Sequence, residues 1–226
     1  MTTNGFVLHD SATAPAASAA ILDSVQKGWG FVPNLHRVLA ESPAPLEAYA
    51  TLWGIAEKTG FTAVERNVVY LSIIYENECT YCMAGHTGLS KMTKVGEDVI
   101  AAIRAGNSVA DARLEALHVF AASVTRHRGV VSNAEVAALK SAGFHNRAIL
   151  DVLVLAATKL ISLHEPPGAY AERCVHEGCG MERATQACGV TTRCRRRPGD
   201  AVPWRRLGRR RHQIRHALRS TISPTS

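Results

Sequence analysis

The sequence lacks the features that mark several large classes of protein. No run of 18 or more apolar residues occurs, because Asp151 and Lys159 interrupt the most apolar stretch, residues 149–163. Residues 1–10 carry no basic segment ahead of an apolar one, so we expect no secretory leader. A glycine-rich phosphate loop is also missing. We therefore expect a cytoplasmic protein that does not bind membranes.

Long strand patterns are missing as well, and helical patterns take their place. Alternating apolar and polar residues never continue for long enough to predict a sheet. Apolar residues instead recur at helical spacing, as in Leu46, Tyr49, Trp53 and Ala56. The expected helices span residues 18–26, 35–40, 46–58, 82–92, 97–105, 111–125 and 133–142, with two more beginning near residues 62 and 145. The pattern predicts an all-α fold.

Charge is distributed unevenly between two parts of the chain. Residues 1–163 hold 13 Lys and Arg against 14 Asp and Glu, a net charge of −1, whereas residues 164–226 hold 13 Arg and no Lys against 5 acids, a net charge of +8. Because helical spacing also stops there, we predict a helical domain at residues 1–162 and a disordered Arg- and Cys-rich tail at residues 163–226.

Three explanations for the composition of the tail stay open. A shift of reading frame near codon 163 of a GC-rich gene would over-produce Arg, Gly, Pro and Ala. A genuine Arg-rich arm would bind nucleic acid or another anionic surface with strong salt dependence. The third explanation is a solvated linker with no partner.

The most informative motif is the Cys-x-x-Cys-x-x-x-His stretch formed by Cys79, Cys82 and His86. At positions i, i+3 and i+7 these side chains share one stripe of a helix. Exposed amides and the helix dipole stabilise a thiolate at a helix N-terminus, and a nearby histidine can take its proton. Oxidation of one sulfur by a peroxide then allows the other to condense with it into a disulfide. The motif therefore predicts a redox-active dithiol.

Other interpretations of these residues remain. The two cysteines can form a structural or zinc-binding pair, although residues 1–162 contain no second Cys-x-x-Cys to complete four ligands. His86 alone can be an ordinary surface or core histidine. Glu65 fits a capping box with Thr62, and a proton-relay role requires the fold to return it to the cysteines.

The motif at residues 79–86, with Phe-Thr-Ala-Val-Glu-Arg at residues 61–66 and Gly-Phe-Val-Pro-Asn-Leu at residues 30–35, resembles the alkylhydroperoxidase AhpD-like branch of the carboxymuconolactone decarboxylase family. The resemblance covers about residues 5–162. It implies an AhpD-like all-α fold that assembles into trimers or hexamers. It also implies a peroxidase-type site in which Cys82 is the peroxidatic thiol, Cys79 its resolving partner and His86 part of a proton relay.

One position departs from the pattern of that family. The catalytic Glu of its best-studied peroxidases stands twelve residues before the first Cys, where this chain has Asn67. An amide cannot act as a general base at neutral pH, so Glu65, Glu76 or Glu78 would have to serve. Lactone-decarboxylating members use a site without the dithiol, which argues against that activity here.

Two functions therefore stand as hypotheses. The first is a thiol-dependent hydroperoxidase or disulfide oxidoreductase in antioxidant defence, with no metal or organic cofactor. Its partners would be a small hydroperoxide and a dithiol reductant, and its catalytic residues Cys82, Cys79, His86 and Glu65. The second is a non-enzymatic helical oligomer that senses redox state or holds a metal, with the tail recruiting nucleic acid.

Overall fold

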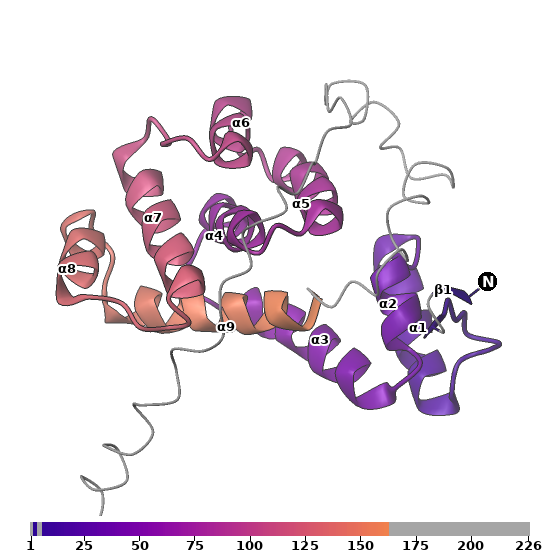
Figure 1. Ribbon diagram of the computed structural model, residues 1–226. Coiled ribbons are helices and arrows are strands. Elements are labelled where there is room, and N and C mark those ends of the chain that lie inside the picture. The colour runs from indigo at the N-terminus through magenta and orange to yellow at the C-terminus, as the bar shows by residue number, and fades with distance from the viewer. Residues whose placement is uncertain (1, 4–5, 163–226) are drawn as a thin grey trace, which may run out of the picture. The chain divides into compact units, whose positions relative to one another are not determined.

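A computed structural model describes residues 2–3 and 6–162, so the expectations for the tail lie outside the described residues. Eleven elements follow one another in this part of the chain (Figure 1). They are β1 (Thr2–Thr3), β2 (Phe6–Val7), α1 (Ala16–Trp29), α2 (Asn34–Leu39), α3 (Pro43–Ala56), α4 (Ala63–Glu76), α5 (Thr80–Met92), α6 (Glu97–Ala105), α7 (Ala112–Arg126), α8 (Asn133–Ser141) and α9 (Asn146–Ser162).

The all-α prediction is confirmed, with one small addition. Strands β1 and β2 form an antiparallel pair in which Thr2 faces Val7 and Thr3 faces Phe6. The sequence gives no sign of this pair, because two-residue strands are too short to show an alternating pattern. Helix α1 is also longer at both ends than the expected residues 18–26.

Local capping explains where two of the helices begin. At the start of α4 the Thr62 hydroxyl accepts from the backbone amide of Glu65, whose carboxylate accepts from the backbone amide of Thr62. Ser132 and Glu135 make the same reciprocal pair at the start of α8. Each pair satisfies amides that a helix leaves without intrahelical partners, and the predicted capping box of Thr62 and Glu65 is confirmed.

Helix α4 is the centre of the domain and contacts α5, α6, α7 and α9. Its residues 67–74 are all buried, and they contribute to two apolar clusters. Helices α3 and α9 lie side by side (Figure 1). Because α9 packs against both α3 and α4, its last turn comes to lie beside α5, which follows α4 directly.

The turn between α4 and α5 fixes the position of the first cysteine. Asn77 closes α4 by donating from its side-chain amide to the Ile73 carbonyl, at 2.8 Å. Glu78 then takes a left-handed conformation with φ of 53°, which is uncommon for a residue other than glycine. The reversal places Cys79 at the N-cap of α5.

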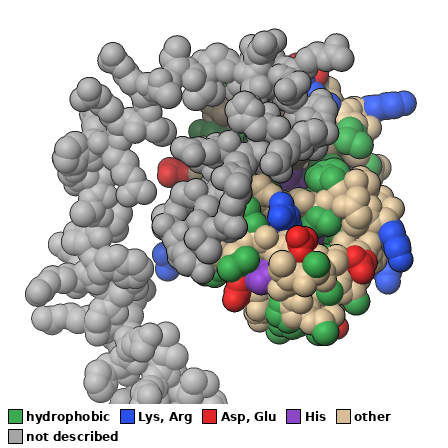
Figure 2. Space-filling model, turned by 90° about the vertical axis from the view of Figure 1, so that its right-hand side faces the viewer, with side chains coloured by type: hydrophobic (Ala, Val, Ile, Leu, Met, Phe, Trp, Pro, Cys, Tyr) green, Lys and Arg blue, Asp and Glu red, His purple; other side chains and the backbone are tan. Residues whose placement is uncertain are grey.

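The surface of the domain is mixed in character. On the face shown in Figure 2, hydrophobic, basic and acidic side chains lie interspersed among the described residues. On α9 three large apolar side chains are exposed, Leu150, Leu153 and Leu160. Among the helices of residues 6–162, none combines the length and apolar character that crossing a membrane requires.

Candidate active site

The two cysteines of the motif meet at the start of α5. Cys79 caps the helix, and its sulfur accepts from the backbone amide of Cys82 at 3.3 Å. A disulfide joins the two residues, whose Cα atoms lie 5.3 Å apart. Both are buried, with 6% and 4% of their surfaces exposed. When the pair is reduced, the free amides of this first turn favour a thiolate here.

His86 lies one turn further along α5 and is also buried. Its ring stacks on Trp53 of α3, with 5.9 Å between ring centroids, and lies 4.9 Å from the ring of Tyr70. Burial, and then the charge of Lys159, holds the pKa of His86 well below its usual value. The imidazole is therefore neutral at neutral pH. The prediction that Cys79, Cys82 and His86 share one helix stripe agrees with these positions.

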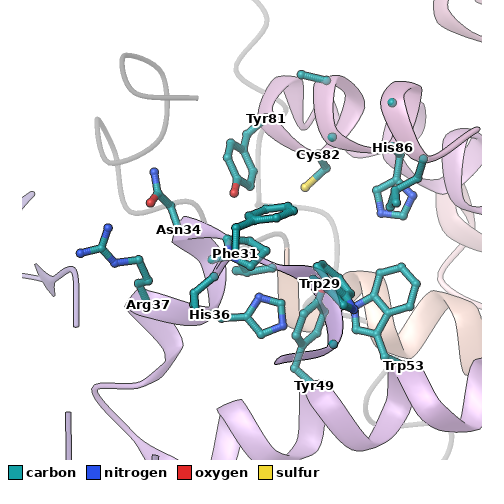
Figure 3. A pocket seen from close by; sticks show the side chains of 18 of the residues that line it. Trp29, Phe31, Asn34, His36, Arg37, Tyr49, Trp53, Tyr81, Cys82 and His86 are labelled. Atoms are coloured by element: carbon teal, nitrogen blue, oxygen red, sulfur yellow. The ribbon is translucent and has the colours of Figure 1, made fainter. Parts of the chain in front are cut away.

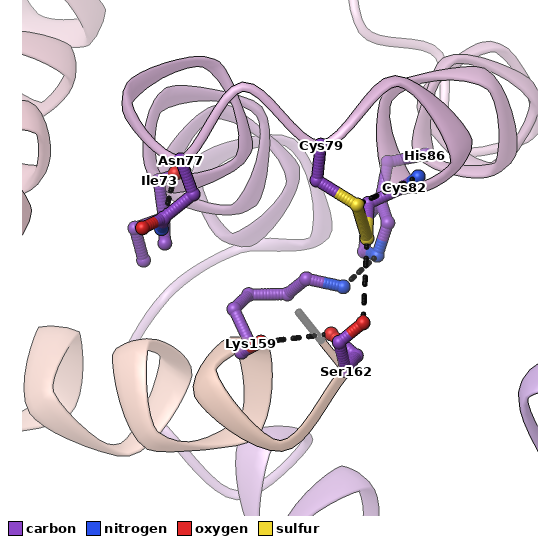
Figure 4. The surroundings of a disulfide bond; sticks show 7 residues. All are labelled: Ile73, Asn77, Cys79, Cys82, His86, Lys159 and Ser162. Carbon is purple, nitrogen blue, oxygen red and sulfur yellow. Dashed lines mark hydrogen bonds between the residues drawn. A yellow bond between two sulfur atoms is a disulfide. The ribbon is translucent and has the colours of Figure 1, made fainter. Parts of the chain in front are cut away.

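Lys159, on the last turns of α9, is the site residue that sequence reasoning missed. Only 2% of its surface is exposed, and its Nζ lies 3.1 Å from His86 Nε2 (Figure 4). Burial lowers the pKa of this amine to about 7. A signal was present in the sequence, since Lys159 follows Val152 and Leu155 at i+7 and i+4, on the buried face of the helix.

The end of α9 also reaches the dithiol. The carbonyl oxygen of Ser162 lies 3.7 Å from Cys82 Sγ, so it can accept a hydrogen bond from the Cys82 thiol in the reduced protein (Figure 4). The Ser162 hydroxyl donates back to the carbonyl of Lys159 at 2.9 Å. Two residues of α9, far from the motif in sequence, thus complete the surroundings of Cys82.

Glu65 does not join this group. Its carboxylate accepts from the Thr62 backbone and forms an ion pair with Arg113 at 2.9 Å. Arg113 donates to it from both Nε and Nη2 and also covers the ring of Phe144. These contacts assign Glu65 to capping α4 and to joining α4 to α7, which is the capping role that the sequence left open beside a proton relay.

The other carboxylates considered as replacements lie elsewhere too. Glu76 forms an ion pair with Arg126 of α7, and Glu78 lies exposed in the turn before Cys79. The Asn67 amide donates to the Ala63 carbonyl and to the Thr93 hydroxyl, so it serves to connect α4 with the end of α5. Within the described residues, the ionisable group that touches His86 is an amine rather than a carboxylate.

A cavity of about 710 Å³ opens beside Cys82 (Figure 3). Cys82 and His86 of α5 form one side of it and Tyr49 and Trp53 of α3 face them, while Lys159 lines it as well. The remaining walls are mainly apolar or aromatic and come from Leu8, Trp29, Phe31, Val32, Leu35, Tyr81, Leu89 and Met92. Neither Cys79 nor any carboxylate is among the described residues that line this cavity. The cavity therefore gives a ligand access to Cys82 rather than to Cys79.

His36 adds a second buried histidine to the wall of the cavity. Its Nδ1 has no hydrogen-bond partner among the described residues, and its ring contacts Trp29 and Tyr49 edge-on. Burial lowers the pKa of His36 to about 4, so this ring too is neutral at neutral pH. Within residues 6–162, no three His, Cys, Asp or Glu side chains converge as a metal site would need.

Part of the chain matches a known protein family. Residues 43–124, which include the whole motif, match the model of the Carboxymuconolactone decarboxylase family. The resemblance to that family seen in the sequence is thereby confirmed. A search of curated proteins finds no match to this chain.

The solved structures that are similar to the chain include two crystal structures of uncharacterized proteins. One is an uncharacterized peroxidase-related protein from Ralstonia eutropha described as an alkylhydroperoxidase AhpD core, with a TM-score of 0.61 and 23% identity over 69% of this chain and 84% of that one. The other is an uncharacterized peroxidase-related protein from a Silicibacter species, with a TM-score of 0.56 and 23% identity over 67% and 80%. At this identity the two structures establish the AhpD-like fold alone.

Proposed function

We propose that this AhpD-like chain is a thiol-dependent hydroperoxidase that reduces organic hydroperoxides at Cys82 with electrons from an external dithiol. One observation carries the proposal: of the two cysteines joined at the start of α5, only Cys82 lines the cavity. The peroxide-reacting sulfur must meet the substrate, whereas its partner needs only to reach that sulfur. The family resemblance gives the same two roles to the same two residues.

The chemistry runs in three balanced steps. The Cys82 thiolate attacks one oxygen of the hydroperoxide, the O–O bond breaks, and the departing alkoxide takes one proton to become an alcohol. Cys79 then attacks the resulting sulfenic acid, which forms the disulfide and releases water. A dithiol reductant returns two electrons and two protons through a mixed disulfide, and both cysteines are reduced again.

The walls of the cavity support an organic substrate. Cavities of several hundred Å³ with mainly apolar walls bind ligands by burying their apolar surface. Aromatic side chains such as Trp53 and Phe31 supply this surface in the cavity beside Cys82. Hydrogen peroxide has no apolar surface to bury and gains nothing from them. We therefore propose that organic hydroperoxides react faster than hydrogen peroxide.

We also propose that the protein is a homo-oligomer, a trimer or a hexamer. Leu150, Leu153 and Leu160 stand on one stripe of α9, with 63%, 46% and 60% of their surfaces exposed. Apolar side chains exposed together in this way are typical of surfaces that another protein covers. A second copy of the chain is the partner that the family resemblance implies.

The test is hydroperoxide consumption by the purified protein with a dithiol reductant. Wild type is run beside Cys82→Ser and Cys79→Ser, and Cys188→Ser from the tail is the matched control. Turnover should vanish in Cys82→Ser and stop after one event in Cys79→Ser, while the control keeps its rate. Oxidation of Cys79 and Cys82 to a disulfide without turnover in wild type would instead favour the redox-sensing function.

A further inference from the structure

Lys159 is a buried cation without an anionic partner in the described part of the chain. None of the ion pairs among the described residues involves Lys159. Within these residues, its Nζ makes one hydrogen bond, to His86 Nε2 at 3.1 Å. A buried lysine is costly because its ammonium loses hydration that nothing repays. A fold that keeps such a group beside a reactive dithiol invites a functional explanation.

We propose that Lys159 is the general acid of the peroxidase reaction and the counter-ion of the Cys82 thiolate, held in place by His86. This inference rests on the proposed function, and it assigns a role to a residue that neither the motif nor the family resemblance includes. Lys159 takes over the proton transfer for which the sequence suggested Glu65, Glu76 or Glu78.

The geometry of the ammonium group fits both roles. Lys159 extends from α9 toward the disulfide and His86 (Figure 4), and it lines the cavity together with Cys82. An ammonium has three N–H donors and no acceptor. His86 Nε2 accepts one of them, since its ring is neutral, and the other two remain for the thiolate and for the oxygen of a bound hydroperoxide.

The proton balance follows from this arrangement. When the O–O bond breaks, the two electrons of that bond go to the alkoxide, which takes a proton from Lys159 Nζ and leaves as the alcohol. The neutral amine regains a proton from water through the open side of the cavity. A lysine serves well as a general acid when its pKa lies near the working pH, and burial places that of Lys159 at about 7.

The groups that surround Lys159 set the expected pH dependence. Cys82, Cys79 and His86 face it from α5, the ring of Tyr70 faces it from α4 at 6.0 Å, and Ser162 lies beside it on α9. Among these, Lys159 has a pKa that burial lowers to about 7, and Cys82 must lose its proton to react with a peroxide. The rate of peroxide reduction should rise as Cys82 ionises and fall as Lys159 loses its proton.

The decisive experiment compares leaving groups in Lys159→Met, with Lys140→Met as the control because Lys140 is exposed on α8. A single turnover of reduced protein is timed with an alkyl hydroperoxide, whose alkoxide needs a proton, and with a peroxyacid, whose carboxylate leaves without one. Loss of a general acid should slow the alkyl hydroperoxide by about 100-fold or more. The peroxyacid should slow much less. An equal slowing of both substrates, as a purely structural role would give, overturns the inference.

A second readout is independent of peroxide turnover. In the Cys79→Ser background, the rate at which Cys82 is alkylated by neutral iodoacetamide reports its thiolate fraction at each pH. Removal of the Lys159 charge should raise the pKa of Cys82 by about 1–3 units, so alkylation at neutral pH falls about tenfold or more. Lys159→Gln replaces Lys159→Met if the latter does not fold.

The two readouts separate the inference from the proposed function. An alkylation profile that Lys159→Met leaves unchanged overturns the inference, even if wild type reduces hydroperoxides. A shifted profile in a protein that reduces no hydroperoxide supports the counter-ion role and overturns the proposed function alone.

Discussion

Replacing Lys159 by methionine should make the protein more stable while removing most of its activity. Burial lowers the pKa of Lys159 from its ordinary value of 10.5 to about 7. The unfolded chain therefore binds the Lys159 proton more tightly than the folded protein does. This difference in proton affinity lowers the unfolding free energy at every pH at which Lys159 is protonated in the unfolded chain. Methionine has a side chain of similar length, carries no charge and packs well in irregular apolar space.

The magnitude follows from the size of the pKa shift. Lowering this pKa from 10.5 to about 7 corresponds to about 4 kcal/mol at pH 7, where the folded lysine is half protonated. The variant leaves His86 Nε2 without its partner, which costs about 1–3 kcal/mol. The net gain in unfolding free energy is then about 1–3 kcal/mol, or about 3–10 °C in melting temperature for a domain of this size.

The sign of the effect can be checked with pH. Between about pH 7 and pH 10.5 the unfolded chain keeps the Lys159 proton and the folded protein does not, so the stability of wild type rises across this window. The advantage of Lys159→Met should therefore be largest at or below pH 7 and should be lost by about pH 10.5.

The assay is denaturant unfolding of the oxidised proteins, followed by far-UV circular dichroism across this pH range. Lys140→Met is again the control and should stay within about 0.5 kcal/mol of wild type, since its side chain is exposed. A Lys159→Met protein that is less stable than wild type at pH 7 would refute the reasoning. So would an advantage that does not shrink as the pH rises.

Three further predictions concern the capping carboxylate, the cavity and the surface of α9. Glu65→Gln should lower the unfolding free energy by about 1–2 kcal/mol in a denaturant titration, because it weakens the cap and the Arg113 ion pair, and should leave kcat for hydroperoxide reduction within about twofold. Wild type should show a higher kcat/KM for cumene hydroperoxide than for hydrogen peroxide in the coupled assay. Trp53→Ala should lower kcat/KM for cumene hydroperoxide only. Equal losses of kcat/KM for the two peroxides would contradict a role of Trp53 in binding the substrate. Leu153→Lys should reduce the oligomer measured by light scattering to a smaller species, whereas an unchanged mass would show that this stripe of α9 is not the interface.

Features that depend on residues close together in the sequence were predictable. The residues of each capping box lie within four positions of one another, so the starts of α4 and α8 were predictable from Thr62 and Ser132. The spacing of Cys79, Cys82 and His86 was likewise enough to place them together on α5. The family resemblance was visible for the same reason, because its strongest motif is one continuous segment.

The rest of the site depends on contacts between distant segments. Lys159 meets His86 across 73 residues, and only the packing of α9 against α3 and α4 brings them together. Helical periodicity could have placed Lys159 on the buried face of α9, but it carries no information about which element that face meets. For Glu65 the difficulty was of another kind, since a carboxylate at a helix start fits a cap and a relay equally well until Arg113 is seen beside it.

Because Lys159 and Ser162 lie at the end of α9, the surroundings of Cys82 are complete only when the last turn of this helix is docked. Helix ends are the parts of a helix that open first, and both residues lie in the last turn of α9. A chain in which this turn has not yet docked keeps its two sulfurs but has neither the ammonium nor the carbonyl oxygen beside Cys82. Under the proposed function, the rate at which the dithiol reacts with peroxide would report whether the last turn of α9 is docked beside Cys82.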